Sequence, residues 1–354
     1  MWKEKALQKE DLLSIPIQQI DLETIHTIGE LLEAFGGTSI QARNLSLCLQ
    51  TYRKMLEDRQ CIIFLGLSGP LIAAGLRKVL TDMIKKELVD VIVTTGAIVY
   101  QDFYQALGYS HYQGDPEADD IHLREHWVDR IYDTYVDEEG FRKTDVLISK
   151  IVGELEPKVH SSRELLRFMG EYVDDPNSIL RAAAERGVPV FAPAIADSSI
   201  GIGLTLHYKE HREKKSSFSI NPIRDNYEIT RIRMKSQHSG AIFIGGGVPK
   251  NYINDTEVTA QLMGSDTRGH TYAFQLTMDM PFWGGLSGST LKEAKSWGKV
   301  HGSAAGPIAY VEASVSLPLL VGAVLELGYG AGRRVNIVWD GDEPEIISSR
   351  DKNS

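Results

Sequence analysis

The chain alternates between short, almost wholly apolar runs and longer segments in which apolar residues recur every three to four positions. Continuous apolar runs are typical of buried strands, and the longer pattern is typical of helices that bury one face. Strands are expected over residues 61–67, 89–95, 188–192, 241–247, 271–277 and 308–313. Helices are expected over residues 40–56, 71–86, 98–106, 161–172, 176–186, 222–235, 248–263 and 315–327. The alternation predicts an α/β fold with a doubly wound, mainly parallel sheet and helices on both faces.

Two segments depart from this alternation. Residues 1–30 mix charges with short apolar clusters and are expected to form an N-terminal helical arm. Residues 108–143 are rich in Asp, Glu, His and Tyr and are interpreted as one insertion over a face of the fold. No repeat or linker divides the remainder, so residues 31–340 are predicted to form a single domain, followed by a frayed tail over 341–354.

Composition and charge limit the class of protein. The 354 residues carry a net charge of −10, which argues against binding the phosphates of a nucleic acid. No apolar run reaches the roughly 18 residues that a membrane-spanning helix needs, so no membrane association is expected. The only cysteines, Cys48 and Cys61, cannot form a disulfide framework, and the N-terminus lacks a signal-peptide core. A cytoplasmic location is the simple inference.

The insertion contains a histidine cluster that could suggest a metal site. His122 and His126 are four residues apart, a spacing that places both on one face of a helix, and His111, Asp119 and Asp120 are nearby in the sequence. The surrounding charges are more typical of a solvated helix. No metal is therefore predicted.

Small or polar residues follow four of the predicted strands. They are Ser68-Gly69, Thr94-Thr95-Gly96, Asp197-Ser198 and Gly245-Gly246-Gly247. The carboxyl ends of parallel strands share one edge of a sheet, where backbone N–H groups and helix N-termini favour a phosphate. A dinucleotide is plausible there, although GGGVPK lacks the G-x-G-x-x-G spacing and tight turns without a ligand remain an alternative.

The best candidate for covalent chemistry is Lys299, in the stretch GGLSGSTLKEAKSWGKV over residues 284–300. The small residues at its start let a ligand approach the backbone, and Gly298 suits the C-terminal cap of a short helix. Trp297 and Glu293 could bind a cationic substrate beside the amine of Lys299. Taken alone, the stretch favours the interpretation of Lys299 as a lysine at an ordinary surface cap.

Seven segments in order make the chain resemble the deoxyhypusine synthase family over roughly residues 30–330. They are LLEAFGGT (31–38), FLGLSGPLIAAGLR (64–77), VDVIVTTG (89–96), VPVFAPAIADSSIG (188–201), IFIGGGVPKN (242–251), EAKSWGK (293–299) and EASVSLPLLV (312–321). The resemblance implies Rossmann-like subunits, assembled as homotetramers with active sites across a dimer interface. It also implies NAD-dependent transfer of an aminobutyl group from spermidine through an imine on Lys299.

The resemblance assigns roles to individual residues. Lys299 and Glu293 would be catalytic, and Trp297, Asn251 and Glu293 would bind the substrate. The NAD contacts would be Ser68, Thr95, Gly96, Asp197, Gly245, Gly246, Gly247, Ser287, Glu312 and Ala313. The acceptor stays open: a protein lysine on a hypusine-bearing translation factor, or a diamine such as putrescine, which would give homospermidine.

Several positions depart from the family pattern. Some positions that carry acidic residues in the hypusine-forming enzymes carry other residues here: Tyr100, Gln101, Ile202, Trp283 and Leu286. Asn251 stands where those enzymes carry a histidine, and Glu312 stands where they carry an aspartate. Asp102, Asp279 and Glu312 are candidate replacements. The departures favour a changed donor or a small acceptor. They also leave open a non-catalytic homologue that binds NAD or a polyamine, and, as a weaker hypothesis, a dehydrogenase in which Lys299 is structural.

Overall fold

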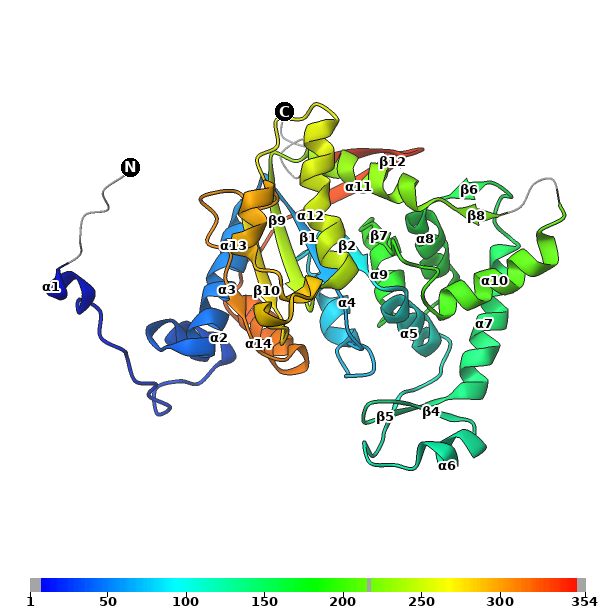
Figure 1. Ribbon diagram of the computed structural model, residues 1–354, viewed down its shortest axis with the longest axis horizontal. Coiled ribbons are helices and arrows are strands. Elements are labelled where there is room, and N and C mark those ends of the chain that lie inside the picture. Colours follow the sequence, from blue (N-terminus) through cyan, green and yellow to red (C-terminus); the bar gives the residue numbers. More distant parts are fainter. Residues whose placement is uncertain (1–7, 215–217, 349–354) are drawn as a thin grey trace.

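A six-stranded parallel sheet forms the centre of the protein (Figure 1), in a computed structural model that describes residues 8–214 and 218–348. The strand order is β11-β10-β9-β1-β2-β7, and every neighbouring pair is parallel. The strands are β1 (Cys61–Leu67), β2 (Val91–Thr94), β7 (Val190–Phe191), β9 (His238–Ile244), β10 (Tyr272–Leu276) and β11 (Ile308–Ala309). The predicted doubly wound α/β fold is confirmed, with the six sheet strands at the six predicted runs.

Alternate residues of the central strands face two separate cores. On β1, Ile63 and Leu65 join the larger core, whereas Ile62 and Phe64 join the smaller one. Both faces of the sheet are therefore covered, which explains why these strands are apolar throughout.

Helices cover the two faces in groups. The larger core includes residues of α3 (Ile40–Glu57), α4 (Arg77–Lys85), α5 (Gly96–Ala106), α8 (Ser162–Tyr172), α9 (Ile179–Arg186) and α14 (Ala313–Glu326). The smaller core includes residues of α11 (Pro222–Lys235), α12 (Gly247–Leu262) and α13 (Leu291–Ala294). Each predicted helix is present. The helix expected over residues 71–86 is shorter than predicted, because residues 71–75 form turns ahead of α4.

Residues 108–143 form a small lobe below the α5 and α7 region in Figure 1. The strands β3 (Tyr112–Gln113), β5 (Thr134–Asp137) and β4 (Val128–Ile131) pair antiparallel, and α6 (Asp120–Glu125) precedes β4. The chain returns from this lobe to the main fold through α7 (Glu138–Val152), which packs against α10 (Ser199–His211). A two-stranded pair, β6 (Val159–His160) with β8 (Ser219–Ile220), lies beside α11.

The ends of the described chain lie outside the sheet. Residues 8–27 run away from it, with one short helix, α1 (Lys9–Leu12), before α2 (Ile28–Ala34) and the 3₁₀ turn η1 (Phe35–Gly37). The predicted frayed tail is wrong for 343–348, because β12 (Val335–Asp340) pairs antiparallel with β13 (Glu343–Ser348). Arg333 anchors this hairpin through its buried ion pair with Asp90. Residues 349–354 lie outside the described part, and the division into an arm and one domain stays a prediction.

Candidate active site

The order of the strands creates a topological switch point at the centre of the sheet. The chain passes from β1 outward to β2 and β7, then returns to the other side of β1 as β9. The helices that follow β1 and β9, α4 and α12, pack on opposite faces. In such sheets a ligand binds outside the carboxyl ends of the two strands at this switch point. Ser68 follows β1 there, and Gly245–Gly247 follow β9.

The three glycines form a close-packed cradle at this point. The backbone N–H of Gly246 donates to Ser68 Oγ at 2.8 Å. A Cβ on Gly246 would lie 2.5 Å from Ser287 Cα, and Gly245 has φ +70°, so both positions require glycine. The helix α12 begins at Gly247 with no side-chain cap, which leaves its first N–H groups for an anion. The uncapped N–H groups at the start of α12 are donors of the kind that fit a phosphate group.

A buried lysine connects this cradle to the next pocket. Lys250 Nζ donates to Gln275 Oε1 at 2.9 Å and to the carbonyl oxygens of Ser287 and Ser289. Gln275 Nε2 in turn donates to the carbonyls of Gly245 and Ser287, both at 2.8 Å. Burial lowers the pKa of Lys250 to about 8, although the charges of Glu293 and Asp279 oppose this shift. Sequence reasoning did not select Lys250, although it ends the GGGVPK motif.

Lys299 lies in a pocket of about 220 Å³ on the other side of Lys250. The lining is Lys250, Asn251, Asn254, Leu286, Ser289, Thr290, Glu293, Ala294, Trp297 and Lys299. The 3₁₀ turn η4 (Lys295–Trp297) ends at Gly298, whose φ of +69° turns the chain so that Lys299 N–H reaches the carbonyl of Ala294. The Lys299 ammonium is 5.4 Å from the centre of the Trp297 ring, in cation–π range. The structure thus brings Lys299, Trp297, Glu293 and Asn251 together around one pocket, and their roles stay a prediction.

Two further polar residues of this site were missed. Asp255 Oδ1 lies 2.8 Å from Lys299 Nζ, and Asn251 Oδ1 accepts from the same nitrogen at 3.3 Å. Asn254 is 4% exposed, and its Oδ1 has no hydrogen-bond partner among the described residues. The spacing of Asn251 and Asp255, four residues apart on a predicted helix, was the available signal.

The other predicted cofactor residues do not join this cluster directly. Thr95 and Gly96 lie at the start of α5 after β2, and Asp197 is exposed after β7. Glu312 caps α14 by accepting from Ser314 N–H, and Ala313 begins that helix beyond β11. The strands β11 and β2 are four positions apart, which is roughly 19 Å at about 4.8 Å per strand. A ligand that touched all these residues would extend along the whole edge of the sheet.

The residues that depart from the family pattern have varied surroundings. Tyr100 is buried in α5 and donates to the carbonyl of Phe141. Gln101 Oε1 accepts from Ala73 N–H. Ile202, Trp283 and Leu286 are exposed. The suggestion that Asp102 replaces a lost carboxylate is wrong, because its buried oxygens already accept from Arg77, Ser178 and the N–H groups that begin α9.

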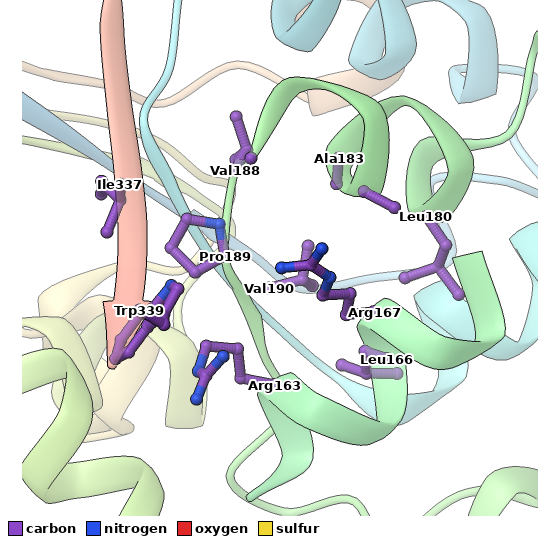
Figure 2. Close-up of a pocket in the computed structure, with 12 residues that line it drawn as sticks. Arg163, Leu166, Arg167, Leu180, Ala183, Val188, Pro189, Val190, Ile337 and Trp339 are labelled. Atoms are coloured by element: carbon purple, nitrogen blue, oxygen red, sulfur yellow. The ribbon is translucent and has the colours of Figure 1, made fainter. Parts of the chain in front are cut away.

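Figure 2 shows a separate, smaller cavity between α8, α9 and β12. It has a volume of about 30 Å³, room for one or two water molecules. Arg163 lies 3.7 Å above the ring of Trp339 and pairs with Glu228, so its charge is already satisfied. This cavity is a packing feature of the hairpin.

Residues 8–214 and 218–348 contain no group of three or more His, Cys, Asp and Glu side chains placed to bind a metal. His122 and His126 do lie together, with ring centres 4.3 Å apart. Within the same ranges, no helix has the length and apolar character required to cross a bilayer.

Comparisons with known proteins agree with this arrangement. A family model described as deoxyhypusine synthase matches residues 30–324. The chain belongs to the deoxyhypusine synthase family. The match includes the glycine cradle and the Lys299 pocket, and ends before the β12–β13 hairpin. Membership in the deoxyhypusine synthase family supports a transferase role.

Relatives in this family cover nearly the whole chain. The "Deoxyhypusine synthase-like protein" of Chlorobaculum parvum is 42% identical over 90% of this chain and 92% of its own. The "Probable deoxyhypusine synthase 2" of Methanosarcina mazei is 41% identical over 93% of this chain and 95% of its own. The crystal structure of a "putative deoxyhypusine synthase" from Entamoeba histolytica, 17% identical, has a TM-score of 0.57 over 88% of this chain and 97% of its own. That structure supports the fold.

Proposed function

We propose that this member of the deoxyhypusine synthase family transfers an aminobutyl group from spermidine, or a related polyamine, through an imine on Lys299. The observation that carries the proposal is the contact chain from the glycine cradle to the lysine. Ser287 contacts Gly246, Lys250 bonds to the Ser287 carbonyl, and Lys250 and Lys299 line one pocket. A cofactor in the cradle would therefore lie next to a substrate in the pocket.

NAD fits the cradle and would lie against Ser68, Gly245–Gly247 and Ser287. When bound, it would accept a hydride from the carbon next to the donor's secondary nitrogen and later return it. The protein's own residues would perform the transfer. The ring of Trp297 and the carboxylate of Glu293 would orient the cationic chain, and Lys299 Nζ would attack the oxidised carbon. The bond to the departing nitrogen breaks, 1,3-diaminopropane leaves with a proton, and an acceptor amine then displaces Lys299.

A small diamine acceptor such as putrescine suits this pocket. The volume of about 220 Å³ is modest, and Leu286 presents an apolar side chain where the hypusine-forming enzymes carry an aspartate. Product analysis by mass spectrometry tests this choice, with spermidine alone, with added putrescine and with an added hypusine-bearing translation factor. Homospermidine is expected only when both aminobutyl donor and diamine are available, and modification of a translation-factor lysine instead would contradict it.

A second copy of the chain is expected to cover this site. Phe282 and Trp283, just before the pocket residue Leu286, are 80% and 78% exposed. Apolar side chains so exposed mark interaction surfaces. This supports the proposed homotetramer with active sites at a dimer interface. Light scattering on wild type and on Phe282→Ser/Trp283→Ser tests it, and an unchanged mass for the variant would argue against this surface.

Borohydride trapping tests the central proposal. The protein is incubated with NAD and labelled spermidine, reduced, and mapped by peptide analysis. Label is expected on the peptide that contains Lys299 and should be absent in Lys299→Ala. Glu293 is the single carboxylate among the residues that line the pocket, which favours a non-catalytic NAD- or polyamine-binding homologue as the second candidate. Polyamine binding without label or release of 1,3-diaminopropane would support that candidate.

A further inference from the structure

A polar pocket lies at the edge of the sheet opposite the candidate active site. It has a volume of about 430 Å³ and is bordered by the end of α3, by Arg59 and by the glycine-rich segment 327–335. Arg59 stands two residues before β1, at the amino end of that strand, whereas Ser68 and the glycine cradle follow the carboxyl ends of β1 and β9. The seven residues of β1 span roughly 20 Å at about 3.3 Å per residue. The two sites are therefore separate.

Two arginines of this pocket have no charged partner. Arg59 and Arg334 both line it, and both are exposed. Neither side chain makes an ion pair or a hydrogen bond with any residue in the ranges 8–214 and 218–348. Each guanidinium presents a planar fork of donors, a geometry that matches a phosphate or a carboxylate group. The pair therefore offers two places for an oxyanion.

The other charges that line the pocket are already paired. Arg333 forms its buried ion pair with Asp90, and a carboxylate oxygen of Glu57 lies 2.7 Å from Arg53 Nε. The two unpaired arginines thus give the pocket a positive charge, in a chain whose net charge is −10. An anion would be attracted to this part of the surface.

The glycine-rich loop adds backbone donors. The N–H groups of Gly330 and Gly332 have no acceptor in the part of the chain that the structure describes, and both glycines have positive φ, +78° and +75°. Successive N–H groups in turns of this kind form concave anion sites. Arg333, 7% exposed, holds the loop by donating from Nη2 to the Cys61 carbonyl at 2.8 Å. Its buried Nε has no hydrogen-bond partner among the described residues, so one donor of the lining is unused.

The C-terminal ends of α3 and α14 also border the pocket, and the carbonyl groups at such ends favour cations. They do not account for both arginines. The loop itself satisfies the end of α14, because Gly328 N–H donates to the Leu325 carbonyl and Tyr329 N–H donates to the Val324 carbonyl. Each helix end is equivalent to roughly half a negative charge. Two full positive charges therefore remain in excess.

We infer that this pocket binds a small anion with two or more phosphate or carboxylate groups, held by Arg59, Arg334 and the unpaired N–H groups of the loop. The arginines come from different segments, one before β1 and one before β12, so a ligand with two anionic groups can bind both. The volume, about twice that of the Lys299 pocket, leaves room for such a ligand. No covalent step is involved, and the site goes beyond the proposed function.

Calorimetry of the full-length protein with inorganic tripolyphosphate, at about 0.15 M salt, tests this inference, and citrate is the second probe. Saturable binding is expected, and the tighter probe identifies the class of anion. Arg59→Gln and Arg334→Gln should each weaken binding about tenfold, because a hydrogen bond between charged groups is worth roughly that factor or more. Arg334→Lys keeps the charge without the fork and should bind with intermediate affinity. Both side chains are exposed, so the variants should stay folded, which circular dichroism verifies.

The matched control is Arg268→Gln, at an exposed arginine before β10 that also lacks a partner among the described residues. Its affinity should equal that of the wild type. Equal losses in Arg59→Gln and Arg268→Gln would mean general attraction to surface charge and would overturn the inference, as would no binding of either probe. Tripolyphosphate bound at the glycine cradle instead would be displaced by NAD and unaffected by Arg59→Gln, which would also contradict it. The assay needs neither polyamine nor turnover, so its result is independent of the proposed function.

Discussion

His270 and Lys299 are joined through their backbones. The N–H of His270 donates to the carbonyl of Lys299 at 3.0 Å, and the N–H of His301 donates to the carbonyl of His270 at 3.0 Å. The imidazole of His270 is fully buried, with Nδ1 2.9 Å from Ser239 Oγ and Nε2 3.3 Å from the Ile253 carbonyl. Burial lowers the pKa of His270 to about 4, so the ring is neutral at pH 7. The segment that carries Lys299 is thus tied to a buried, fully bonded side chain.

Replacing His270 with alanine should therefore disturb Lys299 without removing any group from the pocket. The Ser239 hydroxyl and the Ile253 carbonyl would each lose one buried hydrogen bond, worth about 0.5–1.5 kcal/mol, while they keep Glu257 and Thr256 as partners. We expect a clear loss of stability in urea unfolding and a reduced yield of trapped imine. His301→Ala is the matched control on the same segment. Its more accessible side chain bonds Ser303, and it should change stability by about 0.5 kcal/mol or less. Equal effects of the two substitutions would show that His270 has no special role.

Gly246→Ala should damage the cofactor cradle. The new methyl group would lie 2.5 Å from Ser287 Cα, and overpacking of this kind costs about 1–3 kcal/mol. Calorimetry should show a large loss of NAD affinity. Gly285→Ala is the control, because no atom lies within 4 Å of a Cβ there and its φ is −70°. NAD affinity that survives Gly246→Ala unchanged would place the cofactor elsewhere.

Much of the fold follows from local pattern. Strands β1, β2, β9 and β10 are buried on both faces, so their apolar runs are continuous and easy to detect. The β12–β13 hairpin is not a continuous apolar run, and it was missed. Ile337 is buried while Asn336 and Val338 are exposed, and Arg333, just before β12, is anchored to Asp90. The pairing itself is local, with Asp340 opposite Glu343, so the alternating burial and the Gly341-Asp342 turn were the available signals.

The residues of the candidate site that share one motif could be predicted from the sequence. Those that come together only when the chain folds could not. Lys299, Trp297 and Glu293 share one short stretch, so the resemblance located them together. Asp255 is 44 positions before Lys299, and their contact arises only when α12 packs beside α13. The wrong assignment of Asp102 has the same origin. It follows Tyr100 and Gln101, where the family pattern is acidic, but the fold places it against the start of α9, where it bonds to Ser178.

Lys250→Met should loosen the loop that carries Ser287. The substitution keeps the length of the side chain but removes the donor to Gln275 and to the carbonyls of Ser287 and Ser289. Each buried acceptor left without a partner costs about 1–3 kcal/mol. We expect faster hydrogen exchange over residues 286–290 and weaker NAD binding. Lys292→Met, at an exposed position of α13, should leave both unchanged. Unaltered exchange in Lys250→Met would mean that Gln275 alone fixes the loop.

Asp225 should make the protein less stable as the pH rises. Its side chain is fully buried, Oδ1 accepts from Ser162 N–H at 2.7 Å, and Oδ2 has no hydrogen-bond partner among the described residues. Burial, assisted by the charge of Glu228, raises the pKa of Asp225 to about 7 from a usual value of 3.8. The folded state therefore binds the proton more tightly than the unfolded state between these two values. The stability contributed by the protonated form is complete below about pH 4 and is lost as the pH rises through about 7.

Asp225→Asn removes this titration and keeps the acceptor for Ser162. Each pH unit within the window is worth about 1.4 kcal/mol, so the free energy of unfolding of the wild type should fall relative to the variant by a few kcal/mol between pH 4 and pH 8. Urea unfolding of both proteins at several pH values measures the difference. Asp197→Asn is the control, because that carboxylate is exposed and should leave the pH dependence unchanged. Parallel curves for wild type and Asp225→Asn would mean that Asp225 is ionised in the folded protein, with Arg163 compensating its charge.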